Sequence, residues 1–220
     1  MKDLFSEADL ARIREAVAGA EQRTSGEIVP YIVSQSDGYD VAVWRGACTS
    51  AILVWLVAML VVQFYQGWGL SWLYTNWSLA VLVLSAGILG ALLTAYVSPL
   101  KRVLSGGALL DQAVHRRAVM AFVEEEVFST RERTGILLFI SLLEHRIEVL
   151  GDTGINRKVT PDEWTDVVRR IRKGIKDGNI ADGLVDAIGM CGELLERGGV
   201  EIRPDDENEL PDDIRIRGDE

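Results

Sequence analysis

The side chains of this chain that could do chemistry are carboxylates. The sequence contains no Gly-rich phosphate-binding loop and no HExxH, GxSxG or CxxC motif, and its two histidines have no nucleophile at a recognisable spacing. Four acidic residues stand where expected strands or helices begin or end: Glu27, Asp152, Asp177 and Asp182. If the fold brings these ends together, their oxygens could hold a hard cation such as Ca²⁺. The alternative is that they act as turn formers and helix caps.

Two short motifs near these residues resemble known sites but lack essential positions. Asp152-Thr153-Gly154 follows an apolar strand, as the aspartic-protease triplet does, but it occurs once, and Ile155 replaces the small polar residue expected after it. Residues 177–183 (DGNIADG) resemble the start of an EF-hand loop. However, Ala181 stands where an oxygen ligand is required, and Ile188 takes the place of the closing Glu. We therefore expect an ordinary turn at the first motif and no EF-hand at the second.

The helices that would position these carboxylates are recognised by capping and periodicity. Ser6 with Asp9, and Thr160 with Glu163, have the spacing of capping boxes, and each pair precedes a stripe of apolar residues at helical spacing. Two further amphipathic patterns end near Phe128 and at Gly198. Helices are therefore expected at about 6–24, 110–128, 160–176 and 184–197.

Three stretches predict β-strands. Residues 27–34 (EIVPYIVS) and 135–143 (GILLFISLL) are apolar on both faces, which is typical of buried strands. Residues 146–150 alternate between polar and apolar and would pair with the second strand as a β-hairpin. Pro30 cannot donate a hydrogen bond to a ladder, which favours an edge position or a bulge for the first strand.

A long apolar segment interrupts this pattern. From Gly46 to Leu100 there is no charged residue and no histidine. At about 1.5 Å per residue a single helix would be far longer than the roughly 30 Å hydrocarbon core of a bilayer, so two spans are expected, at about 44–65 and 77–97. Between them an aromatic cluster from Tyr65 to Trp77 resembles an interfacial belt. The sequence thus predicts a transmembrane helical hairpin at 44–100; the alternative is a pair of buried core helices.

The charges that flank the hairpin predict its orientation. Arg45 precedes the first span, and Lys101 and Arg102 follow the second, whereas the connection is uncharged. The positive-inside rule then places both flanks and both termini in the cytoplasm, on an integral protein of the inner or plasma membrane. Residues 1–43 and 101–200 can fold there as one discontinuous domain. Residues 201–220 form an acidic tail that we expect to be disordered or to lie on the domain.

The charge distribution bears on the partners. The formal net charge is −10, which offers none of the basic surface that a nucleic acid requires. A basic face is nevertheless expected on the helix that starts at Thr160, from Arg169, Arg170, Arg172, Lys173 and Lys176. Held near the cytoplasmic leaflet, it could rest on anionic lipid. The alternative is a solvated helix face.

Outside the hairpin the sequence resembles the TPM domain family. The resemblance rests on Ser25-Gly26-Glu27 before a strand, on residues 133–140 (RTGILLFI) and 146–151 (RIEVLG), and on 175–184 (IKDGNIADGL). It covers most of residues 5–199 once the hairpin is excised. It implies an α/β sandwich in which helices lie on both faces of a small mixed sheet.

The resemblance also carries functional expectations. Family members are linked to assembly or maintenance of membrane complexes, and acid phosphatase activity and calcium binding at an acidic cleft have been proposed for some. Carried over by position, Glu27, Asp152, Asp177 and Asp182 would line that cleft in this chain. An internal hairpin departs from the commoner family pattern of a signal peptide or a C-terminal anchor.

These observations favour a membrane-anchored interaction domain over an enzyme. Its partners would be the lipid bilayer and another membrane protein, and Ca²⁺ is the candidate ligand of the carboxylates. The alternative is a metal-dependent, phosphatase-like hydrolase, in which the carboxylates hold a metal that activates water. No histidine or lysine is expected beside the four carboxylates, which argues against the hydrolase.

Overall fold

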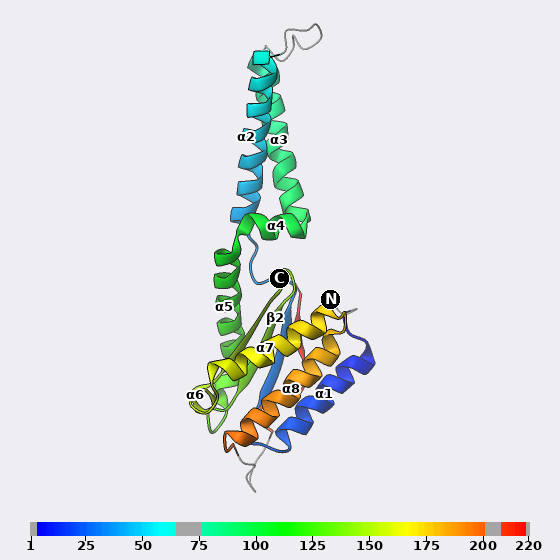
Figure 1. Cartoon of the computed structure of the whole chain (residues 1–220), viewed down its shortest axis with the longest axis vertical. Helices are drawn as coiled ribbons and strands as arrows, with labels where there is room; N and C mark the ends of the chain where they lie inside the picture. Colours follow the sequence, from blue (N-terminus) through cyan, green and yellow to red (C-terminus); the bar gives the residue numbers. More distant parts are fainter. Residues whose placement is uncertain (1–3, 65–75, 201–207, 219–220) are drawn as a thin grey trace. The chain divides into compact units, whose positions relative to one another are not determined.

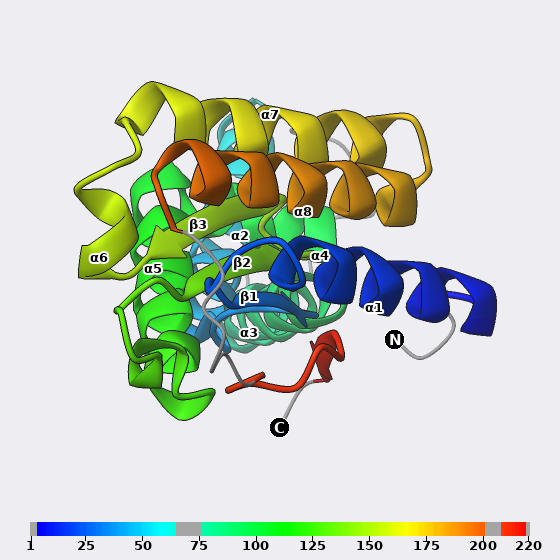
Figure 2. The same cartoon turned by 90° about the horizontal axis from the view of Figure 1, so that it is seen from below.

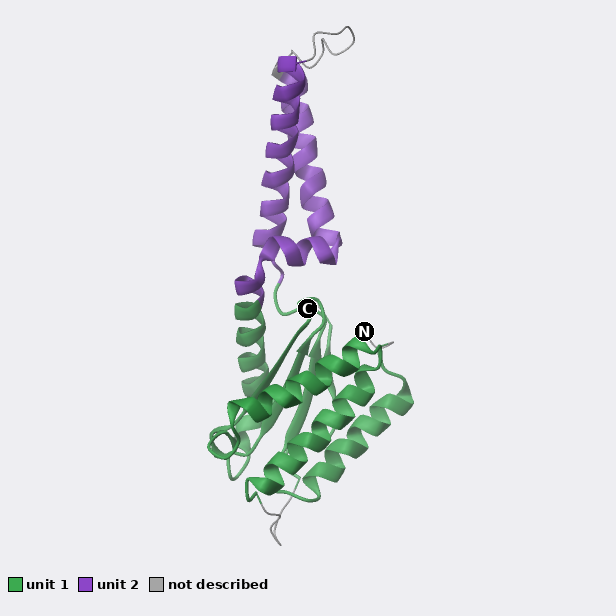
Figure 3. Cartoon of the chain, in the orientation of Figure 1, with its two compact units in different colours: residues 1–37, 111–220 green, residues 38–110 purple. Residues whose placement is uncertain are grey.

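The computed structural model describes residues 4–64, 76–200 and 208–218. The chain forms two compact units, residues 1–37 with 111–220 and residues 38–110 (Figure 3). We call the first the sheet unit and the second the hairpin unit. Each is described by itself.

The sheet unit is built on a mixed sheet with the strand order β3-β2-β1-β4. β1 (Ile28–Val33) pairs in parallel with β2 (Ile136–Ser141) and with β4 (Arg215–Arg217), while β2 pairs antiparallel with β3 (Arg146–Gly151). Every residue of β1 and β2 is buried, as in strands that are covered on both faces. The three predicted strands are confirmed to within two residues at each end.

Helices cover both faces of this sheet. One face carries α1 (Glu7–Glu21), α8 (Ile180–Arg197) and α7 (Pro161–Lys176), which lie side by side (Figure 1 and Figure 2), and the other carries α5 (Gly107–Glu124). Because strand side chains alternate, they supply two separate cores. The first contains Ile28, Ile32, Ile136, Leu138 and Ile140, and the second contains Val29, Tyr31, Val33, Leu137 and Phe139. This is the α/β sandwich that the resemblance implied.

Both predicted capping boxes are present. The Ser6 side chain accepts a hydrogen bond from the Asp9 N–H (3.1 Å), and Asp9 accepts one from the Ser6 N–H (3.1 Å). At α7 the Glu163 carboxylate accepts a hydrogen bond from the Thr160 N–H (2.8 Å), and Pro161 occupies the first helical position. These bonds satisfy backbone N–H groups that have no partner inside the helix, so local sequence alone fixes where α1 and α7 begin.

β1 as a whole is an inner strand of the sheet, whereas Pro30 predicted an edge position or a bulge. The carbonyls of Glu27 and Val33 accept hydrogen bonds of 2.8 and 3.1 Å from the β2 side. The backbone groups of the odd-numbered residues of β1 therefore point to β2, and those of the even-numbered residues point to β4. The ladder with β4 begins only at Tyr31. The nitrogen of Pro30 therefore points to a stretch of β1 that β4 does not reach, where no donor is required.

The strand β4 lies within the predicted acidic tail and was not predicted. Ile214 and Ile216 pack against the first core, and Arg215 and Arg217 each lie 3.1 Å from the carboxylate of Glu125. Residues 208–218 are therefore part of the fold.

The hairpin unit contains α2 (Asp40–Phe64), α3 (Asn76–Tyr96) and a short helix, α4 (Ser98–Ser105). Two of its helices, Asp40–Phe64 and Trp77–Tyr96, are long and apolar enough to cross a membrane, with a mean hydropathy of 2.2 each. Only 6% of each apolar window is buried, so neither is a core helix within this chain. Apart from Trp77, which is 84% exposed, the predicted aromatic belt lies outside the described residues.

Small and hydroxylated residues line the contact between α2 and α3. Ser50 Oγ donates a hydrogen bond to the Ala86 carbonyl across the helix pair (2.9 Å), and Thr94 is fully buried. A Cβ built on Gly90 would lie 2.5 Å from the Gly46 carbonyl oxygen, so the two backbones approach closely. Close packing through small residues is the usual way in which helices associate in lipid.

The helix α4 packs on both α2 and α3. Arg45 Nη1 donates hydrogen bonds to the carbonyls of Leu104 (2.8 Å) and Ser105 (3.0 Å) and so caps the end of α4. The predicted flanking charges Arg45, Lys101 and Arg102 thus belong to two helices that are in contact.

Candidate functional site

The four candidate carboxylates lie in two places. Glu27 and Asp152 flank the start of β2, since the Glu27 carbonyl accepts a hydrogen bond from Ile136 (2.8 Å) and the Asp152 N–H donates one to Gly135 (2.9 Å). Asp177 and Asp182 lie at the turn between α7 and α8. α7 begins near Asp152 and ends at this turn, so a helix of about 24 Å separates the two places. The structure therefore does not form the expected four-carboxylate cleft.

No group of three or more His, Cys, Asp or Glu side chains that could hold a metal ion occurs among the residues that the structure describes. A cation at the α7–α8 turn would have to be bound by two carboxylates together with amide, backbone or water oxygens.

Asp152 has a structural role that accounts for its position. Its Oδ1 accepts a hydrogen bond from Thr153 N–H (2.6 Å) at the start of the short helix α6 (Thr153–Asn156), and its Oδ2 lies 2.8 Å from Arg133 Nε. A Cβ on Gly154 would lie 2.2 Å from the Glu132 carbonyl oxygen, so only glycine fits there. The Asp-Thr-Gly triplet is thus the helix cap and tight turn that the sequence favoured.

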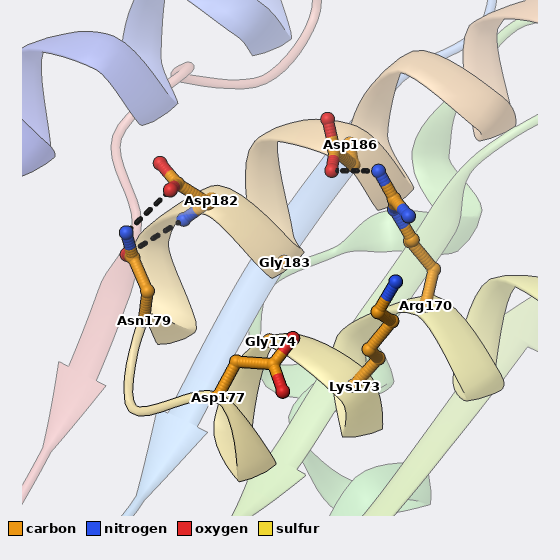
Figure 4. Close-up of a pocket in the computed structure, with 8 residues that line it drawn as sticks. All are labelled: Arg170, Lys173, Gly174, Asp177, Asn179, Asp182, Gly183 and Asp186. Carbon is orange, nitrogen blue, oxygen red and sulfur yellow. Dashed lines mark hydrogen bonds and ion pairs between the residues drawn. The ribbon is translucent and has the colours of Figure 1, made fainter.

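The turn between α7 and α8 forms a small pocket of about 160 Å³ (Figure 4). Its lining residues come from the end of one helix and the beginning of the next: Arg170, Lys173, Gly174, Asp177, Asn179, Asp182, Gly183 and Asp186. Gly178, at φ +76°, turns the chain, and the Asn179 side chain caps α8 by accepting a hydrogen bond from the Asp182 N–H (3.2 Å).

Two glycines set the distance between the pocket's walls. A Cβ built on Gly174 would lie 2.5 Å from the Cα of Gly183 and 2.8 Å from the carbonyl oxygen of Asn179. Because these are backbone atoms, they cannot turn aside as a flexible side chain can. Glycine at both positions therefore brings the end of α7 against the start of α8 and holds the pocket's polar groups together.

The polar groups of the pocket differ in how far they are engaged. Asp182 accepts hydrogen bonds from Arg12 Nη2 (2.6 Å) and from the Asn179 amide, and Arg170 pairs with Asp186. The bond to Asp182 raises the pKa of the Arg12 guanidinium. The side chains of Asp177 and Lys173 make no hydrogen bond or ion pair with any other described residue, so a carboxylate and an ammonium group are both available to a ligand at this pocket. The expectation that no lysine lies beside the candidate carboxylates was wrong.

Residues 109–194 match the TPM domain. The TPM match runs from α5 through β2, β3 and α7 into α8, and therefore includes the whole α7–α8 pocket. The resemblance seen in the sequence is confirmed for this segment. No match was found among curated protein sequences.

The fold also has a solved counterpart. The NMR structure of the BA42 protein from the psychrophilic bacterium Bizionia argentinensis is similar at a TM-score of 0.58, covering 97% of this chain and 95% of that chain. The two sequences are 20% identical. At this identity the likeness concerns the fold and does not carry a function.

The basic residues of the TPM segment's α7 do not all share one face. At about 100° per residue, Arg169, Arg172, Lys173 and Lys176 fall within one arc, and all four are exposed. Arg170 is turned toward α8, where it pairs with Asp186. Arg169 pairs with Asp166 one turn earlier. The predicted basic face is thus four residues wide, with one of them already paired.

The sequence did not indicate the partners of Glu27. This residue is 5% exposed, its Oε1 accepts a hydrogen bond from the Glu209 N–H (3.1 Å), and its burial raises its pKa. A second carboxyl, that of the half-buried Glu21, lies within hydrogen-bond reach of it. Glu21 ends a helix whose sequence is charged, so nothing in the local sequence indicates that one of its oxygens is enclosed.

Proposed function

We propose that the chain is a membrane-anchored TPM domain that acts as a binding module for a membrane protein complex. The observation that carries this proposal is the pair of apolar helices, α2 and α3, whose apolar windows are only 6% buried within the chain. So much exposed apolar helix surface is stable when lipid covers it. The domain that this anchor interrupts would be held at the membrane surface.

The charges at the base of the hairpin support an orientation with the sheet unit in the cytoplasm. Arg45, Lys101 and Arg102 lie at the hairpin's termini, and α4, which carries two of them, packs across α2 and α3. Basic residues at this level would meet the headgroups of the cytoplasmic leaflet. Both termini would then be cytoplasmic.

Cysteine labelling in bacterial cells tests both the anchor and the orientation. In a Cys48→Ser background, Cys191 is fully buried and should not react, so single cysteines can be placed at Glu15 in α1 or at Ser71 in the connection. A membrane-impermeant maleimide should label the Ser71→Cys variant in intact spheroplasts and the Glu15→Cys variant only after permeabilisation. The reverse pattern would overturn the orientation. Release of the protein by alkaline carbonate would overturn the anchor.

The proposed ligand of the module is a divalent cation at the α7–α8 pocket, with Ca²⁺ as the candidate. The support is the uncommitted Asp177 carboxylate beside Asp182 and the side-chain oxygen of Asn179, because hard cations prefer such oxygens. A cation at ten times its Kd would add about 1.4 kcal/mol to the stability of the folded state.

Titration of Ca²⁺ and of Mg²⁺ into the full chain in lipid nanodiscs tests this site. The amide signals of residues 174–183 should shift and saturate, and Asp177→Asn should abolish the shifts. Asp162→Asn is the matched control, since Asp162 is an exposed acid of the same helix, far from the pocket. Absence of saturable shifts up to millimolar metal would remove the cation site.

A hydrolase is the second candidate, and one observation favours it. Arg170 and Lys173 line the same pocket as the two carboxylates, so cationic groups that could hold phosphoryl oxygens stand beside oxygens that could hold a metal. Hydrolysis of p-nitrophenyl phosphate, assayed with each metal for the parent chain, Asp177→Asn and Asp162→Asn, distinguishes the two functions. Turnover lost in the first variant and kept in the second would establish the hydrolase; saturable metal binding without turnover would leave the binding module.

The exposed basic face of α7 gives the module a second contact with the membrane. Three of its residues, Arg172, Lys173 and Lys176, have no acidic partner among the described residues. Each would contribute about 1 kcal/mol near anionic lipid. A hairpin-deleted domain should therefore bind anionic liposomes at low salt and lose that binding when all three become Glu. Equal binding of the Glu variant would show that the face is merely solvated.

A further inference from the structure

Two carboxyl groups, each with an enclosed oxygen, meet where α1 ends and β1 begins. Glu21 is the last residue of α1, Glu27 directly precedes β1, and the two lie within hydrogen-bond reach of each other. Glu27 is 95% buried, being 5% exposed. The Oε2 atom of each is enclosed and makes no hydrogen bond within the described parts of the chain. Two enclosed acceptors without donors are costly unless a proton lies between them.

Glu21 takes the place of a neighbouring strand. Its Oε1 accepts a hydrogen bond from the Ile28 N–H (2.9 Å), which belongs to an even-numbered residue of β1 and so points to the β4 side. The ladder between β1 and β4 starts later, at Tyr31. The carboxyl thus completes the edge of β1 ahead of β4.

Glu27 holds the C-terminal segment, residues 208–218, which we call the strap. The Glu209 N–H donates a hydrogen bond to Glu27 Oε1 (3.1 Å), six residues before β4 begins at Arg215. The strap has two further attachments at this end: the Arg131 N–H donates to the Glu209 carboxylate (3.2 Å), and Arg14 Nε donates to Asp213 Oδ1 (2.6 Å). The carboxyl pair therefore lies beneath the point where the strap meets the sheet.

The surroundings of the pair are acidic. Among the described residues, the charged groups that act on Glu21 are Glu27 and Asp212, and those that act on Glu27 are Glu209 and Glu21. The arginines of the adjoining elements are engaged elsewhere, Arg14 with Asp213, Arg23 with Glu196 (3.1 Å) and Arg215 with Glu125 (3.1 Å). Since the described residues hold no metal-binding group of three, a proton is the cation that fits this pair.

We propose that Glu21 and Glu27 form a proton-dependent latch that holds the strap on β1 and releases it when the pair ionises. With a proton present, one carboxyl donates to the free oxygen of the other, and Glu27 remains an acceptor for the Glu209 N–H. When both groups lose their protons, their charges repel each other and those of Glu209 and Asp212, and burial leaves them without water. Opening of the strap brings the carboxylates into water.

The direction of the pH dependence follows from the environment. Burial is the main cause that raises the pKa of Glu21 to about 9, and it also raises the pKa of Glu27. In the open state the carboxyl has its ordinary pKa of 4.5, and in the closed state its pKa is about 9. The protonated carboxyl therefore stabilises the closed state fully below pH 4.5, and this stabilisation is lost as the pH rises toward 9. The strap should thus be closed in acidic and neutral solution and open in alkaline solution.

Hydrogen exchange of the full chain in nanodiscs, read by mass spectrometry on peptides that cover residues 208–217, tests the latch. The parent is compared with the Glu21→Gln, Glu27→Gln double variant at the same pH, so the intrinsic pH dependence of exchange cancels. The glutamine side chains of the variant can make the same hydrogen bonds as the protonated acids, but they cannot ionise. Exchange should agree within about twofold near pH 4.5, the ordinary pKa of the group, and at pH 9 the parent should exchange more than tenfold faster, since ionisation can change the opening equilibrium up to about tenfold per pH unit.

The control variant is Glu15→Gln, which removes an exposed acid of α1 and should follow the parent at every pH. Should the double variant fold poorly, ¹³C titration of the carboxyl carbons in the parent gives the same answer, with a midpoint above pH 7 for at least one of the pair. Two results would overturn the proposal: a parent-to-variant ratio that stays constant from pH 4.5 to 9, or strap protection that 1 mM Ca²⁺ or Mg²⁺ raises in the parent and not in the variant. The second would make the pair a metal site.

Discussion

The contact between Gly174 and Gly183 allows a test of how the α7–α8 pocket is held. Gly174→Ala adds a Cβ that would lie 2.5 Å from the Cα of Gly183, so the two helices must separate. Overpacking of this kind costs about 1–3 kcal/mol, while replacing a helical glycine by alanine gains about 1 kcal/mol. The matched control is Gly189→Ala in α8, where a Cβ would meet nothing within 4 Å and only the gain remains.

The difference between the two variants isolates the steric cost. Because the helix-propensity gain is common to both, the Gly174→Ala variant should be less stable than Gly189→Ala by about 1–3 kcal/mol. For a unit of this size that is roughly 2–12 °C in Tm. Thermal unfolding of the full chain in nanodiscs, followed by far-UV circular dichroism, measures it. Equal Tm values within 1 °C would show that the helices do not approach as closely as the structure indicates.

Four other outcomes can be checked separately. The free energy of unfolding of the sheet unit should fall as pH rises from about 5 to 9, by up to about 1.4 kcal/mol per pH unit, because burial raises the pKa of Glu21 to about 9; in urea titrations Glu21→Gln should flatten this slope. Thr160→Ala should cost about 1 kcal/mol by loss of the α7 cap, whereas Thr165→Ala, whose hydroxyl bonds only the Pro161 carbonyl, should cost little in the same assay. Gly90→Ala should loosen the α2–α3 pair, seen as faster proteolysis in micelles, more than Gly87→Ala, whose Cβ would make ordinary contacts of 3.6 Å and longer. Burial raises the pKa of the Cys191 thiol to about 12, so maleimide at pH 8 should modify it only in denaturant, by mass spectrometry; reaction in the native protein would contradict its burial.

The features that sequence predicted correctly are those decided by neighbouring residues. A capping box such as that of Thr160 and Glu163 is complete within four positions. The continuous apolar sequences of β1 and β2 predict strands that are buried on both faces. The glycine and asparagine of the α7–α8 turn were likewise visible as turn formers. In the structure, Gly178 adopts the positive φ and Asn179 caps α8.

The features that sequence missed depend on residues far apart in the chain. β4 has three residues, too few for a periodic signal, and it exists through pairing with β1. Glu21 appears solvent-facing in its own helix, but its Oε2 atom is enclosed in the folded unit, where Glu27 and Asp212, both distant in sequence or in another element, act on it. The candidate cleft failed for the opposite reason, because residues at element ends were assumed to converge when α7 holds Asp152 and Asp177 apart.

In the sequence, the hairpin unit is inserted between β1 and β2, which are adjacent parallel strands of one sheet. During synthesis α1 and β1 emerge first, and the apolar faces of β1 must wait for β2 until the whole hairpin has been made. A flexible insertion of this length would slow the pairing, because loop closure loses more entropy as the loop lengthens. Here α2 and α3 form a hairpin whose two ends lie close together, since Arg45 near the start of α2 donates hydrogen bonds to the carbonyls at the end of α4. For the membrane anchor that we propose, insertion of the hairpin would close this loop before the sheet forms, and the sheet unit would fold only after the chain had reached the bilayer.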